Sequence, residues 1–307
     1  MSKPISARRV IITSFVVDVS DVALNVAVMV VTGSVVMLAE SLQGAADLLT
    51  STLLLVGVRR AARRANRDFH FGYGRELFFW VLMAGIAMLV LTGTLSVYVG
   101  VQRLLEPAPV AHVWLTYVAL GAGAASNGYA LALSIQRLRG KHPGPRLWQR
   151  VRHSSLVETK ATFVLDLMGT AASVIGLVAL GWYGVTGNGR LDGVGSILIG
   201  VTVAVLAVGL IVGAKDLLVG RSAGGDIDAL IRQAALEVKG VKRVLDLRTM
   251  YLGSERLLVN VEVNLAGGLE TRQIEKLIDE IKQNIKRQAP IVGHIQVELE
   301  TPVIREP

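Results

Sequence analysis

Lysine and arginine are absent from five long stretches of this sequence, and that distribution constrains the fold more than any other feature. The stretches without basic residues are 10–58, 76–102, 104–136, 161–189 and 191–214. A helix that crosses the hydrocarbon core of a bilayer needs roughly 20 mostly apolar residues. The first stretch is long enough for two such helices, with VTGS at 31–34 as the turn between them. We therefore predict an α-helical membrane protein with six transmembrane helices, at about 10–31, 36–58, 77–102, 111–135, 157–182 and 192–214.

The composition excludes several other classes of protein. Hydrophobic residues make up 52% of the 307 residues and charged residues only 18%, and the mean hydropathy is +0.51. Soluble domains usually carry about 25% charged residues, so this chain is neither disordered nor an ordinary soluble enzyme. Because the chain has no cysteine, disulfide scaffolds, iron–sulfur clusters and thiolate metal sites are excluded as well.

The basic residues lie in alternate connections, which sets the expected orientation of the helices. They are concentrated in the N-terminal tail, in RRAARRANR after the second predicted helix and in residues 137–152 after the fourth. The connections EPAPVAH and TGNGR hold a single basic residue, Arg190. Because basic loops stay in the cytoplasm, we predict cytoplasmic N- and C-termini in a multi-pass protein of the bacterial inner (cell) membrane, surrounded by lipid. The net charge of +8 is then a topology signal, and no nucleic-acid partner is expected.

The last part of the chain has the pattern of a small soluble domain. Two amphipathic helices (226–240 and 270–290) and three strands (241–253, 257–266 and 294–300) follow in the order α-β-β-α-β. This order predicts an open-faced α/β sandwich in the cytoplasm. The predicted domains are a transmembrane domain at 1–214, a linker at 215–225 and a cytoplasmic domain at 226–307.

Acidic and polar residues interrupt the predicted membrane helices, where they are costly and default to a functional hypothesis. On each of three helices these residues are spaced three or four apart, which places them on one helix face. They are Asp18 and Asp21 on the first helix, Glu40, Gln43 and Asp47 on the second, and Thr162 and Asp166 on the fifth. The alternative is that such groups only hold the bundle together through interhelical hydrogen bonds. Glu40 and Asp192 lie near helix ends, so that capping and function remain equal alternatives for them.

Asp47 and Asp166 are the strongest functional candidates. Both fall near the middle of a predicted span, and no Lys or Arg is available there to neutralise them. A buried carboxylate without a basic partner has to bind a proton or a cation. Two such groups from different helices could share one divalent cation and exchange it for protons.

Four sequence segments together resemble the cation diffusion facilitator family. They are VTGSVVMLAESLQGAADLLTS at the second helix, HFGYGRELFFW before the third, TGNGRLDGVGSILIG at the sixth and KDLLVGRSA after it. The resemblance covers nearly the whole chain. It implies a six-helix metal exporter with a ferredoxin-like, metallochaperone-like cytoplasmic domain of αββαβ order, working as a homodimer through that domain and the transmembrane region.

The resemblance also implies a transport site. In the family, two residues four apart on the second helix and two four apart on the fifth bind the metal, which by position gives Gln43, Asp47, Thr162 and Asp166. The family usually has His or Asp at all four positions, whereas an amide and a hydroxyl stand at two of them here. Such an all-oxygen site favours Mn²⁺, Fe²⁺, Mg²⁺ or Ca²⁺, and a carboxylate-rich site still binds Zn²⁺. The metal is cargo, and no resident cofactor is expected.

Further residues receive secondary roles from the same comparison. Asp18, Asp21 and Glu40 are candidates for accessory ligands or a proton relay. Asp68 and His70 are the only plausible pair for a second metal site in the FGYGR segment, and a solvated loop is the alternative. His294 is predicted to be a surface histidine, so metal regulation through the cytoplasmic domain is expected to be weak or absent. Arg75 and Asp216 could form a gating salt bridge or a structural one.

The expected mechanism is alternating access, in which Asp47 and Asp166 exchange a metal ion for protons. Two other readings remain open: a monovalent cation/proton antiporter that uses the same carboxylates, and a non-transporting membrane scaffold or regulator. An enzyme is not expected, because the sequence has no clustered His motif, no Gly-rich phosphate loop with Lys and no Ser/His/Asp arrangement.

Overall fold

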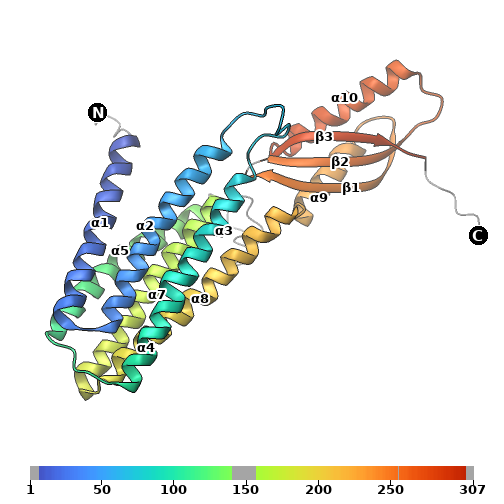
Figure 1. The fold of residues 1–307 in the computed structure, drawn as a ribbon. Coiled ribbons are helices and arrows are strands. Elements are labelled where there is room, and N and C mark those ends of the chain that lie inside the picture. The colour runs from blue at the N-terminus through green and yellow to red at the C-terminus, as the bar shows by residue number, and fades with distance from the viewer. Residues whose placement is uncertain (1–6, 140–156, 255, 302–307) are drawn as a thin grey trace, which may run out of the picture. The chain divides into compact units, whose positions relative to one another are not determined.

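The computed structural model describes residues 7–139, 157–254 and 256–301, with side chains described for 19–136, 161–254 and 256–301. Its first part is helical, as Figure 1 shows, and consists of α1 (Ala7–Thr32), α2 (Val35–Ala61), α3 (Glu76–Met88), the π-helical η1 (Leu89–Thr94), α4 (Leu95–Leu105), α5 (Val113–Arg139), α7 (Val157–Thr186) and α8 (Arg190–Val219). Among the described residues, five helical segments are long and apolar enough to cross a membrane, and Val19–Thr32 of α1 is a shorter apolar helix. The predicted fold class is confirmed.

The chain divides into two compact units, described separately here. One unit comprises Met1–Gly57 and Trp80–Ala214, and the other comprises Val58–Phe79 and Lys215–Pro307. Hydropathy alone gave no reason to group residues 58–79, which connect two membrane helices, with the C-terminal residues. The predicted boundaries at 214 and 225 remain predictions.

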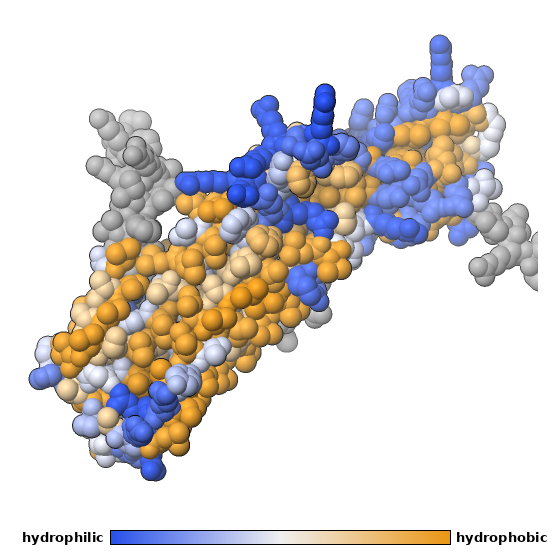
Figure 2. Space-filling model, viewed as in Figure 1, coloured by the Kyte–Doolittle hydropathy of each residue, from blue (hydrophilic) through white to orange (hydrophobic). Residues whose placement is uncertain are grey.

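The helical unit has an apolar outer surface as well as an apolar core. Large hydrophobic side chains such as those of Val30, Tyr129, Val178 and Val205 are each more than 60% exposed. Figure 2 shows hydrophobic residues over most of the visible outer face of the helices. A soluble protein rarely exposes so much contiguous apolar surface, whereas lipid solvates it.

The third membrane span changes its helical pitch midway, at η1, and packs closely on α8. The Thr94 hydroxyl donates to the carbonyl of Leu89, five residues earlier, at 3.1 Å. A Cβ at Gly100 would lie 2.7 Å from the Gly193 carbonyl oxygen, and one at Gly93 would lie 3.1 Å from the Ala204 Cβ. Only residues without a side chain allow the two backbones to approach this closely.

The C-terminal residues form a two-layer α/β domain in the predicted order. Its elements are α9 (Gly225–Leu236), β1 (Val241–Gly253), β2 (Arg256–Leu265), α10 (Thr271–Gln288) and β3 (Val292–Leu299). The sheet order is β1-β2-β3, with β1 antiparallel and β3 parallel to the central β2. Every second side chain of β2, from Leu257 to Val263, is buried, as are Ile231 of α9 and Ile281 of α10. The domain therefore has a hydrophobic core of its own.

Glu237 joins the two helices of this domain. Its carboxylate accepts hydrogen bonds from Asn284, Gln288 and Gln233. These bonds favour the charged form and lower the pKa of Glu237, with Asn284 contributing most. Their stabilisation is therefore present above the ordinary pKa of a glutamate and is lost as the pH falls through the lowered value.

Candidate functional site

Gln43 and Asp47 form a hydrogen-bonded pair on the inner face of α2. The Gln43 Nε2 atom donates to both carboxylate oxygens of Asp47, at 3.2 and 3.3 Å. Gln43 is only 2% exposed, and its Oε1 atom has no hydrogen-bond partner among the described residues. Because the amide nitrogen is held by Asp47, the oxygen remains a buried acceptor, of the kind that a hard cation can use as a ligand.

Asp166 lies on α7, where it is bound by the neighbouring α5. Its carboxylate accepts a hydrogen bond from the Ser134 hydroxyl of α5. The Thr170 hydroxyl bonds back to the Asp166 carbonyl oxygen at 2.7 Å, as is usual for threonine within a helix. Thr162 stands one turn before Asp166, and both are partly buried.

Contacts between α2 and α7 fix how these two helices are aligned. The Ser173 hydroxyl of α7 donates to Glu40 of α2. A Cβ at Gly176 would lie 2.9 Å from Val36 Cγ1. Residue numbers therefore increase along α7 in the direction in which they decrease along α2. The helices are therefore antiparallel, as Figure 1 also shows.

This alignment places the two aspartates at the same depth. Asp47 is seven residues after Glu40, and Asp166 is seven residues before Ser173. Both steps run in the same direction along the bundle and amount to about 10 Å. Asp47 and Asp166 thus lie at one level, on two helices that are in contact.

The first helix brings a further carboxylate near this level. A Cβ at Gly44 would lie 2.8 Å from Val22 Cγ2, so α1 packs on α2 close to the Gln43–Asp47 pair. Asp21, the residue before Val22, is partly buried and accepts a hydrogen bond from Asn25 at 3.4 Å. The side chain of Asp18 lies outside the described residues. Across the described residues, no group of three or more His, Cys, Asp or Glu side chains is positioned to hold a metal ion.

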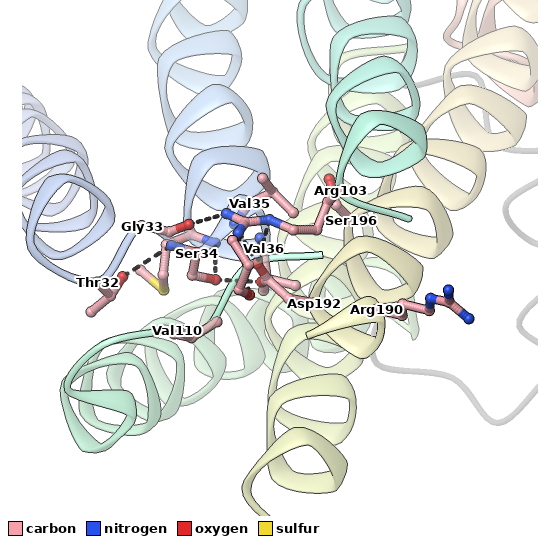
Figure 3. Close-up of polar contacts among 12 residues, drawn as sticks. Thr32, Gly33, Ser34, Val35, Val36, Arg103, Val110, Arg190, Asp192 and Ser196 are labelled. Carbon is pink, nitrogen blue, oxygen red and sulfur yellow. Dashed lines mark hydrogen bonds and ion pairs between the residues drawn. The ribbon is translucent and has the colours of Figure 1, made fainter. Parts of the chain in front are cut away.

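Asp192 caps another helix rather than contributing to the polar groups at mid-depth. Its carboxylate accepts hydrogen bonds from the Ser34 hydroxyl, at 2.6 Å, and from the amides of Val35 and Val36, at 2.8 and 3.0 Å (Figure 3). An anion at a helix N-terminus satisfies amides that lack intrahelical partners. Of the two alternatives left open by the sequence, the structure supports capping for Asp192.

Arg103 completes this network at the start of α2. Its Nε atom lies 3.5 Å from the Asp192 carboxylate, and its guanidinium also donates to the carbonyls of Gly33 and Ala108. Asp192 is fully buried and the Arg103 side chain is 11% exposed. Arg190, by contrast, is exposed and points away from the cluster in Figure 3. Arg103 was not among the predicted site residues, because its position just after the apolar stretch 76–102 indicates only the end of a helix.

The segment with Asp68 and His70 is closed by residues that the sequence analysis did not select. The Asn66 side chain accepts from the amides of Asp68 and Phe69 and donates to the Tyr73 hydroxyl at 2.9 Å. The rings of Phe69 and Tyr73 lie 4.5 Å apart. An Asn whose side chain accepts from the amide two residues later forms an Asx-turn, and Asn66 in the segment ANRDF was the available signal.

Neither Asp68 nor His70 gains a metal-binding partner from this arrangement. Both side chains are exposed, and the metal-ligating group that would include them is absent from the described part of the chain. His294 is exposed, as expected, and meets the ring of Phe71 edge-on at 5.5 Å.

Arg75 and Asp216 do not pair with each other in the described structure, so the predicted salt bridge is not formed here. The Arg75 guanidinium donates instead to the backbone carbonyl of Leu218, in the last turn of α8. Asp216 lies 3.0 Å from Lys215. The last carbonyls of a helix lack intrahelical donors, and a guanidinium satisfies them well, which explains the preference of Arg75.

We expect Gly74→Ala to destabilise the unit formed by residues 58–79 and the C-terminal domain. A Cβ at Gly74 would lie 2.4 Å from the Leu252 carbonyl oxygen, and the backbone of Gly253 leaves no room for it to shift. The expected cost is about 1–3 kcal/mol, measured as earlier hydrogen exchange of residues 62–75. Gly267→Ala, where no atom lies within 4 Å, is the matched control. Equal exchange in the two variants would contradict the prediction.

Comparisons with known proteins decide the family. The cation efflux transmembrane domain matches residues 11–219, and the cytoplasmic domain of cation efflux proteins matches residues 224–302. The chain belongs to the cation efflux family. This confirms the resemblance inferred from the sequence, and the family is one of transporters rather than enzymes. The cation efflux protein described here is accordingly a multi-pass integral membrane protein.

Relatives of this cation efflux protein differ in length. The proton-coupled zinc antiporter SLC30A9 of Xenopus laevis is 27% identical over 266 residues, which cover 83% of this chain but 47% of that protein. The cation-efflux pump FieF of Pectobacterium atrosepticum is 27% identical over 296 residues, covering 91% of this chain and 90% of that one. A solved MamM-CTD structure, 18% identical, covers 25% of this chain and 95% of its own with a TM-score of 0.24. The chain thus spans about half the length of the SLC30A9 relatives it matches.

Proposed function

We propose that this protein exports a divalent metal cation in exchange for protons by alternating access. The observation that carries the proposal is the placement of Asp47 and Asp166 at one depth on two contacting helices, next to the buried amide oxygen of Gln43. Two carboxylates that are neutral when protonated or metal-loaded, and costly when empty and charged, would couple the two fluxes. Gln43, Asp47, Thr162 and Asp166 are the proposed ligands, and Asp21 is a proposed accessory group.

The chemistry of these ligands bears on the cargo. Two carboxylates, an amide oxygen and a hydroxyl are hard donors, which suit Mn²⁺, Fe²⁺ or Mg²⁺. Zn²⁺ remains within the proposed range, because carboxylates also bind zinc and because a zinc antiporter is among the relatives. We further propose a homodimer formed through the cytoplasmic domain and the transmembrane region, in a bacterial inner membrane with both termini in the cytoplasm.

Flux measurements on the full-length protein in proteoliposomes test the proposal. Vesicles are given an imposed pH gradient, and uptake of Mn²⁺, Zn²⁺, Fe²⁺ and Mg²⁺ is followed together with a pH-sensitive dye. We expect at least one divalent cation to move against a counterflow of protons. Na⁺ flux without divalent flux would establish a monovalent antiporter instead. Absence of every cation flux from correctly folded protein would favour a membrane scaffold.

A further inference from the structure

Glu40 is a buried carboxyl group that the proposed metal site does not use. It is 5% exposed and lies where three helices meet. The Ser173 hydroxyl of α7 contacts Glu40 Oε1, and a Cβ at Gly123 of α5 would lie 3.5 Å from the same oxygen. Glu40 Oε2 is buried and has no hydrogen-bond partner among the described residues. The group is therefore enclosed by protein rather than placed at a helix end as a cap.

The burial of Glu40 and the lack of a donor at its Oε2 atom within the described residues favour the protonated acid. The single hydroxyl hydrogen of Ser173 faces two acceptors, Glu40 Oε1 and the Gly169 carbonyl oxygen at 3.1 Å. The Gly169 carbonyl also accepts the backbone amide of Ser173 within α7, so it does not depend on this hydroxyl. If Glu40 were a carboxylate, Oε1 would accept from Ser173, but Oε2 would hold buried charge with no donor among the described residues. A carboxylic acid removes this buried charge, and its O–H can donate to Ser173 Oγ while the Ser173 hydroxyl donates to the Gly169 carbonyl.

The charged groups around Glu40 also oppose its ionisation. The acidic residues on the helices around Glu40 are Asp18 and Asp21 on α1, Asp47 on α2 itself, and Glu158 and Asp166 on α7. The basic residues on α2, α5 and α7 stand at least 13 residues, or about 20 Å along the helix, from Glu40, Gly123 and Ser173; they are Arg59, Arg60, Arg137, Arg139 and Lys160. The basic residue at this end of α2, Arg103, is already paired with Asp192 of α8. A negative charge at Glu40 thus lies closer along α2 and α7 to the carboxyl groups of Asp47 and Asp166 than to the basic residues of those helices.

The distance between Glu40 and the metal level allows the two to influence each other without direct contact. Along the helix, Glu40 lies seven residues, or about 10 Å, from Asp47 and three residues, or about 4.5 Å, from Gln43. A divalent cation held there repels a proton on Glu40 through the low-dielectric bundle. By linkage, metal binding then favours loss of that proton, and protonation favours loss of the metal.

We propose that Glu40 is a dedicated proton-binding site of this exporter, separate from the metal ligands. This inference rests on the proposed function and adds to it the group that carries one of the exchanged protons. In each cycle the Glu40 O–H bond breaks when metal binds, the proton leaves to the solvent on that side, and a proton from the opposite side restores the bond when the metal departs. Ser173 and Gly169 hold the protonated form in place.

The test is metal binding by purified full-length protein, with Zn²⁺ and Mn²⁺ as probes. Calorimetry in buffers of different ionisation enthalpy counts the protons released per metal ion. We expect Glu40→Gln to release about one proton fewer per metal ion than wild type. The apparent Kd of the variant should therefore depend less steeply on pH, by a factor of about ten per pH unit. Glu275→Gln, on the exposed face of α10, is the control and keeps the wild-type count.

A second measurement does not depend on a variant. Infrared difference spectra of the wild-type protein should show loss of a protonated carboxylic acid band when metal binds. Because an amide can donate to Ser173 as the acid does, Glu40→Gln should fold and melt like wild type. The same proton count in Glu40→Gln as in wild type, failure of this variant to fold, or no loss of the acid band would overturn the proposal. If the wild-type protein binds neither Zn²⁺ nor Mn²⁺, both this proposal and the proposed function are overturned. If the wild-type protein releases protons on binding metal and Glu40→Gln releases the same number, only the role of Glu40 is overturned.

Discussion

Asp47→Asn and Asp166→Asn are each expected to lower divalent metal flux by at least about 100-fold, since losing groups that merely support a metal ligand already costs about 10–100-fold. The substitution keeps the size of the side chain and its capacity to accept a hydrogen bond. It removes the negative charge that balances the metal and the group that exchanges protons. Asn at position 47 can still meet the Gln43 amide, and Asn at position 166 can still meet the Ser134 hydroxyl, so folding should persist.

Two controls make this result specific. Asp279→Asn changes an exposed acid on α10 and should leave flux unchanged. Thermal unfolding in detergent should be similar in all three variants, which separates loss of transport from loss of structure. Wild-type flux in either site variant would remove that residue from the proposed transport site.

Asp192→Asn is expected to cause the largest loss of stability, about 3–5 kcal/mol, as is typical when one member of a buried ion pair is removed. Asp192 is fully buried, and its carboxylate serves two amides, a hydroxyl and Arg103 at once. The asparagine keeps one acceptor but leaves the guanidinium of Arg103 buried without its counter-charge. Reversible unfolding in mixed micelles measures the difference.

Arg190→Ala provides the matched control two residues away. Its side chain is exposed and lies outside the Asp192 cluster, so its change in stability should stay within about 0.5 kcal/mol. A double-mutant cycle with Arg103→Met isolates the ion pair. Additive losses in that cycle would show that capping of α2, rather than the contact with Arg103, accounts for the role of Asp192.

The membrane spans could be predicted closely because each charged residue placed in lipid has a large free-energy cost of its own, so that the spans can be read from local sequence. The second span, for example, was predicted at 36–58 and is found at Val35–Ala61. The cytoplasmic domain was predictable for a similar reason, since period-2 and period-3.6 patterns are local. The candidate ligands on α2 and α7 came from the same reasoning together with family resemblance.

Features that depend on contacts between distant segments could not be predicted. The relative depth of Asp47 and Asp166 follows from the Glu40–Ser173 and Val36–Gly176 contacts, which no single helix encodes. The role of Asp192 stayed open until its partners were visible. Arg75 donates to the backbone carbonyl of Leu218. The sequence gives no way to compare the strength of that hydrogen bond with that of an ion pair to Asp216.

The cap on α2 also defines where that helix can pivot. Because the first amides of α2 are bonded to Asp192, we expect any tilt of this helix to pivot about the Val36 amide. Asp47 lies eleven residues further along α2, about 16 Å from the Val36 amide. A tilt of about 10° would move the aspartate by about 3 Å, which is more than the length of a metal–oxygen bond and would take its carboxylate out of coordination.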